Sequence, residues 1–176
     1  MDSLKLVTPH LFGPEGGNVF AVLDGASVEG LREKMHDLQP AHECLFRGEL
    51  EPDMEEVAPY LVQLEQKSEF TDWVIGKGWG KHWGIFAITP ANLRAMRQHF
   101  RRFIRVHDEK GKPLFFRYYD PRVLRVFLPT CKPEELNSMF GEVTAFVAEG
   151  EKPDVLLKFQ NQTGSLQQKE ERLAAK

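Results

Sequence analysis

The sequence predicts a single α/β domain, with a mixed β-sheet flanked by helices and a short C-terminal extension. Its length of 176 residues allows one sizeable core but not two comfortable domains. Apolar residues make up 41% and charged residues 28%, which is typical of folded globular domains rather than disordered chains. Short apolar runs also alternate with segments of helical period, as expected when helices pack on a sheet.

Three parts of the chain differ in pattern. Residues 1–18 are rich in Pro and Gly and have no apolar period, which indicates a loose lead-in segment. Residues 19–148 carry the strands and helices of the expected domain. Residues 149–176 are expected to hold a final strand and a flexible tail, because the Gln- and Lys/Glu-rich stretch from Gln160 favours a frayed helix or disorder.

The first part of the domain has β-α-β spacing. The apolar run Val19–Leu23 is typical of a buried strand and is closed by a turn at Asp24-Gly25. A helix capped by Ser27 follows and ends before Pro40, and Cys44–Phe46 gives a second short strand. This spacing favours a parallel pair of strands joined by a crossover helix. The apolar positions of that helix are Val28, Leu31, Met35 and Leu38.

The middle of the chain continues this alternation. Pro59–Leu64 is apolar enough for a strand, and a short helix is expected around Phe70–Val74. The Gly76–Gly84 segment is predicted to be a loop, since its four glycines disfavour a regular element. A further strand is predicted from Trp83 to Ile88.

A strongly patterned helix is predicted from Thr89, its cap, with Pro90 in its first position. Its apolar stripe is Leu93, Met96, Phe100 and Phe103, and beside it runs an arginine row of Arg94, Arg97, Arg101 and Arg105. Beyond it, the sequence indicates a strand over Leu114–Tyr119, helices from Pro121 and over Pro133–Phe140, and strands over Val143–Ala148 and Val155–Phe159.

The net charge is only −3, but it is unevenly distributed. From Ala91 to Arg125, ten Lys/Arg and three Asp/Glu give a balance of +7. From Glu29 to Asp72, four Lys/Arg and twelve Asp/Glu give a balance of −8. This polarity either orients the molecule toward a partner or is neutralised by packing one part on the other. The acidic total and the lack of a reading motif argue against nucleic-acid binding.

No catalytic, metal or cofactor site is predicted. The glycine segment fails the P-loop spacing, because Ile75 and His82 stand where a glycine and a Ser or Thr are needed. It is better explained as a structural loop that holds Trp79 and Trp83 against the core. Histidines are scattered, and Cys44 and Cys131 lie far apart, so free thiols in a reducing cytoplasm are expected. Neither a signal peptide nor a membrane-spanning run is recognisable.

The Phe115–Arg125 block packs four aromatics and three arginines around Asp120-Pro121. Interfaces favour both residue types, so the block is interpreted as a recognition surface. The alternative is a half-buried strand running into a helix, with Tyr118 pointing into the core. Asp120 is expected to cap the helix that Pro121 starts. Arg117 and Arg122 could then pair with the acidic Glu49–Glu56 loop and hold the fold together.

Several segments, in this order, resemble the type VI secretion effector chaperone or adaptor family, a bacterial domain long catalogued as of unknown function. The similarity covers roughly residues 19–147, and its most specific part is Arg-Tyr-Tyr-Asp-Pro-Arg-Val-Leu at residues 117–124. The segments are Leu23–Ala26, Cys44–Leu50, Val57–Val62, Trp79–Gly84, His99–Arg105 and Phe116–Leu124.

The resemblance implies a cytoplasmic protein without enzymatic activity that binds a toxic effector and helps load it onto the spike protein VgrG. It would not leave with the cargo. The chain departs from the family beyond Val147, where family members carry a larger C-terminal lobe for cargo contacts. The candidate partner contacts are Arg94, Arg97, Arg101, Arg117, Tyr118, Arg122 and Arg125.

Two alternatives from other classes remain. One is an anion- or nucleotide-handling enzyme that uses the Gly76–Gly84 loop. The other is a nucleic-acid-binding module that uses the Arg94–Arg105 helix.

Overall fold

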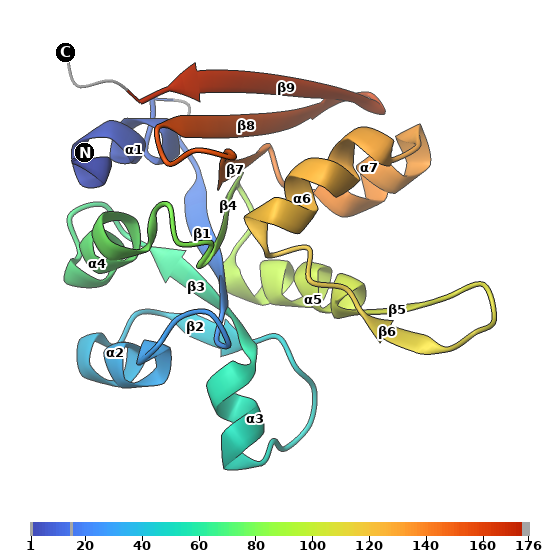
Figure 1. Cartoon of the computed structure of the whole chain (residues 1–176), viewed down its shortest axis with the longest axis horizontal. Coiled ribbons are helices and arrows are strands. Elements are labelled where there is room, and N and C mark those ends of the chain that lie inside the picture. The colour runs from blue at the N-terminus through green and yellow to red at the C-terminus, as the bar shows by residue number, and fades with distance from the viewer. Residues whose placement is uncertain (1, 15, 174–176) are drawn as a thin grey trace.

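A seven-stranded sheet lies at the centre of the protein (Figure 1). The structure, a computed structural model, describes residues 2–14 and 16–173. Over these residues the strand order is β2-β3-β1-β4-β7-β8-β9, and all neighbours are antiparallel. The strands are β1 (Asn18–Asp24), β2 (His42–Cys44), β3 (Pro59–Leu64), β4 (Gly84–Thr89), β7 (Ala145–Glu149), β8 (Val155–Gln162) and β9 (Ser165–Arg172).

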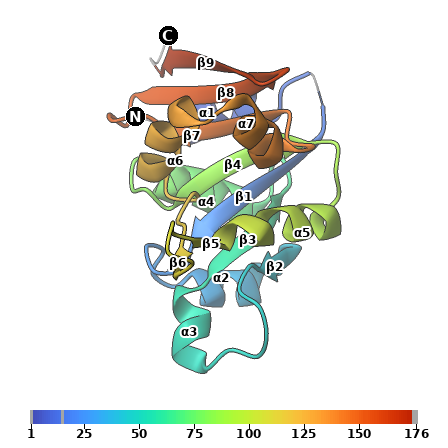
Figure 2. The ribbon, with the colours of Figure 1, turned by 90° about the vertical axis from the view of Figure 1, so that its right-hand side faces the viewer.

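Helices cover both faces of this sheet (Figure 1). One face carries α1 (Ser3–Leu11), α2 (Leu31–Leu38) and α4 (Glu69–Gly78), and the other carries α5 (Leu93–Ile104), α6 (Pro121–Phe127) and α7 (Pro133–Phe140). The remaining elements are α3 (Pro52–Val57), a 3₁₀ turn at Leu128–Thr130, and a separate hairpin of β5 (Arg105–His107) and β6 (Pro113–Phe115). Figure 2 shows α5 and this hairpin in front of the sheet, with α3 below them.

The two-sided burial explains the continuous apolar run at β1. Phe20 and Val22 belong to the core beneath α5, whereas Ala21 and Leu23 belong to the core beneath α1, α2 and α4. Successive side chains of a strand point to opposite faces, so a strand covered on both sides needs apolar residues throughout. The predicted single α/β domain is therefore confirmed. Among the described helices, none is long and apolar enough to cross a membrane.

The predicted parallel pairing of the first two strands is wrong. β3 lies between β1 and β2, and it pairs antiparallel with both. The six-residue β3 is mostly buried and matches β1 residue for residue, from Val19 opposite Leu64 to Asp24 opposite Pro59. The three-residue β2 has no fully buried residue, so it suits the edge of the sheet. The sheet is thus antiparallel rather than mixed.

Both ends of the chain are more regular than their composition predicts. The supposed lead-in contains α1, because Val7 and Leu11 lie on one side of a helix and are buried. The supposed flexible tail forms β9, paired with β8 along its whole length. The hairpin turn places Thr163 at φ 49° and Gly164 at φ 83°, the left-handed conformations that a tight hairpin turn requires. The tail residues from Ala174 lie outside the described residues.

The predicted helix caps Ser27 and Thr89 are also wrong, because the hydroxyl of each donates a hydrogen bond to a group outside the helix. Ser27 donates to the Asp24 carboxylate at 2.7 Å, and α2 begins only at Leu31. Thr89 donates to the carbonyl of Glu142 at 2.9 Å. Asn92 caps α5 instead, accepting a hydrogen bond from the backbone of Ala95 at 3.0 Å. By contrast, Pro59–Leu64 and Pro133–Phe140 form the predicted strand and helix with the predicted bounds.

Candidate partner-binding pocket

Tyr118, at the centre of the Phe115–Arg125 block, belongs to the core. Its side chain is fully buried and stacks on Phe100, with ring centroids 5.8 Å apart. Its hydroxyl donates to the carbonyl of Phe100 at 3.0 Å, and burial raises its pKa well above the usual value. Tyr118 therefore does not present its side chain to a partner, and the alternative of a core-facing tyrosine is the observed one.

The arginines of the block bind acceptors within the protein. Arg117 forms an ion pair with Asp24, which is only 2% exposed and also accepts from Ser27. Arg125 donates to the carbonyl of Gly150 at 2.8 Å. The expected pairing of Arg117 with the acidic Glu49–Glu56 loop is therefore wrong. These contacts tie the block to distant segments of the chain.

Asp120 caps α6 as the sequence predicts, with Pro121 in the first turn. Its carboxylate accepts from the backbone of Arg122 at 2.9 Å and from the Arg122 Nη2 at 2.7 Å. Burial opposes the charge of this carboxylate, but the hydrogen bonds and the charge of Arg122 outweigh burial and hold the Asp120 pKa below its usual value. Arg122 thus also has an internal partner, and not one in the Glu49–Glu56 loop.

The predicted glycine loop is partly helical. α4 continues through Gly76 to Gly78, and a Cβ on Gly78 would lie 2.4 Å from the Trp83 ring. The backbone amides of Gly80 and His82 both donate to the buried Glu149 carboxylate. That carboxylate occupies the place that an anionic ligand would take.

Trp79 and Trp83 act as the structural residues that the sequence predicts. Trp79 is buried and donates from Nε1 to the carbonyl of Pro153 at 2.8 Å. Trp83 packs against Trp73, with ring centroids 4.8 Å apart. Both indoles therefore hold the end of α4 to the sheet.

The arginine row of α5 splits between internal and exposed positions. Arg97 Nε lies 3.2 Å from the Glu43 carboxylate on β2. Arg101 donates from Nη2 to the carbonyls of Cys44 and Phe46, at 2.7 and 2.8 Å. Both contacts fasten α5 to the edge strand, so part of the charge polarity is neutralised internally. Arg94, one helical turn earlier, is exposed.

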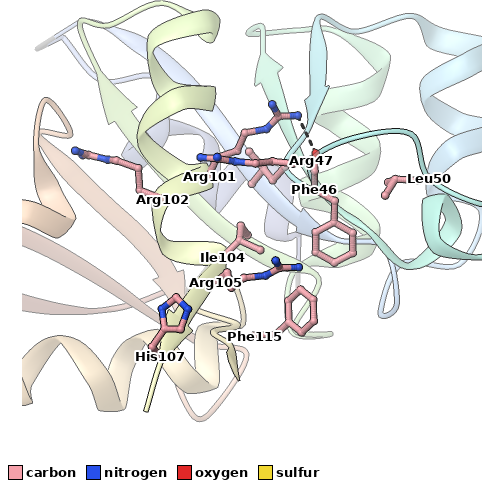
Figure 3. A pocket seen from close by; sticks show the side chains of 10 residues that line it. Phe46, Arg47, Leu50, Arg101, Arg102, Ile104, Arg105, His107 and Phe115 are labelled. Atoms are coloured by element: carbon pink, nitrogen blue, oxygen red, sulfur yellow. Dashed lines mark hydrogen bonds between the residues drawn. The ribbon is translucent and has the colours of Figure 1, made fainter. Parts of the chain in front are cut away.

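A hollow of about 380 Å³ opens where the end of α5, the β5–β6 hairpin and the loop after β2 meet (Figure 3). We call it the arginine pocket. Of the predicted partner contacts, only Arg101 lies in it. It is lined by Leu45, Phe46, Arg47, Leu50, Arg101, Arg102, Ile104, Arg105, His107 and Phe115.

Four arginines line the arginine pocket, and none of them pairs with a carboxylate among the described residues. Arg105 lies over the ring of Phe115, 5.6 Å from its centroid (Figure 3). Arg101 is held by the carbonyls of Cys44 and Phe46. Burial and the neighbouring charges, with Arg97 first and Arg47 among them, lower the pKa of Arg101. The pocket therefore carries positive charge that forms no ion pair with a carboxylate of residues 2–14 or 16–173.

Arg102 is oriented by a neutral histidine. Burial lowers the pKa of His99, which favours its uncharged ring. His99 Nε2 lies 2.9 Å from the carbonyl of Met139 and therefore donates to it, which leaves Nδ1 to accept from Arg102 Nη2 at 2.9 Å. The guanidinium of Arg102 also lies over the ring of Phe103, 5.5 Å from its centroid. The cation is thus placed without being neutralised.

The β5–β6 hairpin separates the arginine pocket from an apolar groove of about 490 Å³. Arg105 and Phe115 line the pocket, whereas their neighbours Val106 and Phe116 line the groove. This division follows from the period of two along a strand. The groove is completed by Phe103, Phe127, Glu134, Glu135, Ser138 and Met139.

Sequence reasoning missed most of the arginine pocket. Arg105 belongs to the arginine row and Phe115 to the block, whereas Arg47 belongs only to the Cys44–Leu50 segment of the family resemblance, where nothing marked it as a partner contact. The loop after β2 brings Arg47 to the pocket at the end of α5, and this placement depends on the sheet order rather than on any local pattern.

Comparison with known families places the chain. A family model described as a domain of unknown function (DUF4123) matches residues 19–138, which include all ten lining residues of the arginine pocket. No curated protein and no solved structure matches the chain. Because the family model covers most of the sequence, the protein belongs to the DUF4123 family.

Proposed function

We propose that the protein is an adaptor chaperone that binds a type VI secretion effector in the bacterial cytoplasm and promotes its loading onto the VgrG spike protein. The proposal is supported by the resemblance of residues 19–147 to the type VI secretion effector chaperone or adaptor family, and the DUF4123 match spans nearly the same residues, 19–138. The family description itself assigns no function, so the proposal depends on the surface of this chain.

The arginine pocket is the observation that carries the proposal. It combines arginines that pair with no carboxylate in the described part of the chain and the exposed Phe115, and interfaces are enriched in both arginine and aromatic residues. The guanidinium groups of the pocket are therefore open to a partner's carboxylate, whereas the arginines of the Phe115–Arg125 block bind acceptors within the protein. A protein-binding role therefore suits the pocket better than it suits the block.

Neither alternative gains support from a specific contact. The amides of Gly80 and His82 already bind Glu149, which disfavours an anion site in the glycine segment. Arg97 and Arg101 bind groups of β2 and its following loop, so the row on α5 is not a continuous strip of exposed cations.

The proposal is tested by deleting the gene in its native bacterium and measuring which proteins are secreted. We expect one effector to disappear from the medium while VgrG is still secreted, and re-expression of the chain to restore that effector. In parallel, the tagged chain should co-purify with the same effector and with VgrG. Unchanged secretion, together with recovery of neither protein, would reject the adaptor role.

A further inference from the structure

We infer that the arginine pocket binds an acidic segment of a partner protein, which places a carboxylate among the guanidinium groups and an apolar side chain against Phe46 and Phe115. This inference deepens the proposed function and rests on it for the identity of the partner, which would be the effector or VgrG. The chemistry of the segment itself follows from the pocket.

The charge of the pocket points to a carboxylate. Arg47, Arg102 and Arg105 are exposed, and no described carboxylate pairs with them. Guanidinium groups present planar donors that match a carboxylate and can bind both of its oxygens. Burial first, and then the positive charges of Arg97 and Arg47, disfavour the charged form of Arg101, so an incoming anion relieves repulsion between like charges.

The apolar part of the pocket points to a hydrophobic anchor beside that carboxylate. The rings of Phe46 and Phe115 lie 5.6 Å apart, and Phe115 is 60% exposed. Leu50 adds a partly buried aliphatic side chain. Figure 3 shows these side chains facing the pocket from two segments distant in the sequence. Covering Phe115 with an apolar side chain removes both surfaces from water.

The pocket is also ordered before a partner arrives. Arg101 is held by two carbonyl oxygens, Arg102 by His99, and Arg105 by the ring of Phe115. Side chains that are already fixed lose little conformational freedom on binding, which favours affinity.

A short acidic segment fits better than a nucleic acid. The loop beside the pocket is acidic, and Glu49 and Glu51 flank the lining residue Leu50. A run of phosphates that crosses the pocket would also have to pass these carboxylates, which repel it, whereas the proposed segment needs to place only one carboxylate at the arginines. A volume of about 380 Å³ also holds a few side chains rather than a helical nucleic acid.

The test uses a photo-crosslinking amino acid in place of Phe115 in the full-length chain, expressed in its native bacterium. The matched control carries the same amino acid in place of Val126, which is 67% exposed and lies outside the pocket. After irradiation, the crosslinked protein and the crosslinked peptide are identified by mass spectrometry.

We expect position 115 to crosslink a peptide that carries several Asp or Glu residues beside an aromatic or aliphatic residue. Crosslinking to neutral or basic peptides, to nuclease-sensitive material, or no more than at position 126 would overturn the inference. An acidic peptide from a protein other than an effector or VgrG would support the pocket chemistry and contradict the proposed function.

The recovered peptide then provides the quantitative test. Synthesised with a fluorescent label, it should bind the full-length Arg47→Glu/Arg105→Glu variant roughly tenfold or more weakly than the wild type. Arg94→Glu, the same change at an exposed position outside the pocket, should leave the affinity within about twofold, since exposed distant charges are screened. Equal weakening by both variants, or no weakening by either, would contradict binding in this pocket.

Discussion

The Phe115–Arg125 block and the arginine pocket have similar compositions but opposite roles in the structure. In the block, Arg117 and Arg122 pair with buried carboxylates and Arg125 binds a carbonyl. In the pocket, the arginines meet aromatic rings, a histidine and carbonyls but no described carboxylate. The difference teaches that the location of the acceptor, not the richness in arginine and aromatics, decides whether such a cluster stabilises the fold or remains for a partner.

Replacing Tyr118, which is buried in the block, and Phe115, which is exposed in the arginine pocket, should give the largest difference in the free energy of unfolding. Tyr118→Ala leaves a cavity in the core and is expected to lower the free energy of unfolding by about 3–5 kcal/mol. Phe115→Ala removes a largely exposed ring, so its cost should stay below about 1 kcal/mol. Urea unfolding followed by circular dichroism measures both, and similar losses for the two variants would contradict the assigned burial.

The titration of the tyrosine hydroxyls tests whether Tyr118 and Tyr119 of the block are buried. Burial is the main cause that raises the pKa of Tyr119 and of Tyr60 to about 12. Burial also raises the pKa of Tyr118 well above its usual value. Each group is more acidic in the unfolded chain, where the pKa is about 10. The contribution of these neutral tyrosines to the free energy of unfolding is therefore fully present below about pH 10 and is lost as the pH rises toward 12.

Ultraviolet absorbance measures this titration. The native protein should form almost no tyrosinate near pH 10, and the urea-unfolded protein should be about half ionised there. A native titration centred at about 10 would place Tyr118 and Tyr119 in solvent.

Asp120→Ala tests the smaller contribution of the block's helix cap. Loss of the cap and of the Arg122 partner should cost about 0.5–2 kcal/mol at neutral pH. Because the Asp120 pKa is lowered in the folded protein, its stabilisation is present above the unfolded value of about 3.9 and is lost as the pH falls through the folded value. The wild type and variant should therefore converge in acid, and a gap that widens in acid would contradict this role.

Two of the pocket arginines, Arg47 and Arg105, should contribute least to stability. Arg47 has no described ion pair, and Arg105 contacts an exposed ring. Arg47→Glu/Arg105→Glu is expected to change the free energy of unfolding by less than about 1 kcal/mol in urea. Arg94→Glu controls for the exchange of an exposed arginine for a glutamate, and a much larger loss for the double variant than for this control would show that Arg47 and Arg105 serve the fold.

The sequence predicted what depends on local patterns. The strand Pro59–Leu64, the helix Pro133–Phe140 and the Asp120 cap follow from apolar periods and from residues next to each other in the chain. α1 and β9 were missed, because tertiary packing orders segments whose composition resembles loops or tails.

The candidate site was harder to predict than the fold. Tyr118 and Phe115 look alike in the sequence, yet one is fully buried and the other is 60% exposed. The partners of Arg117 and of Arg101 come from segments more than fifty positions away, at Asp24 and Cys44. Such pairings depend on the order of the strands in the sheet, and no local sequence pattern predicts that order.

Partner recovery with a folded pocket variant tests the central claim most directly. Tagged wild type, Arg47→Glu/Arg105→Glu and Arg94→Glu would be purified from the native bacterium, and the co-purified effector and VgrG quantified for each. We expect the double variant to keep its urea unfolding midpoint but to lose the partner bound at the pocket, while Arg94→Glu retains that partner. Full recovery of both partners by the folded double variant would show that the arginine pocket is not the binding surface.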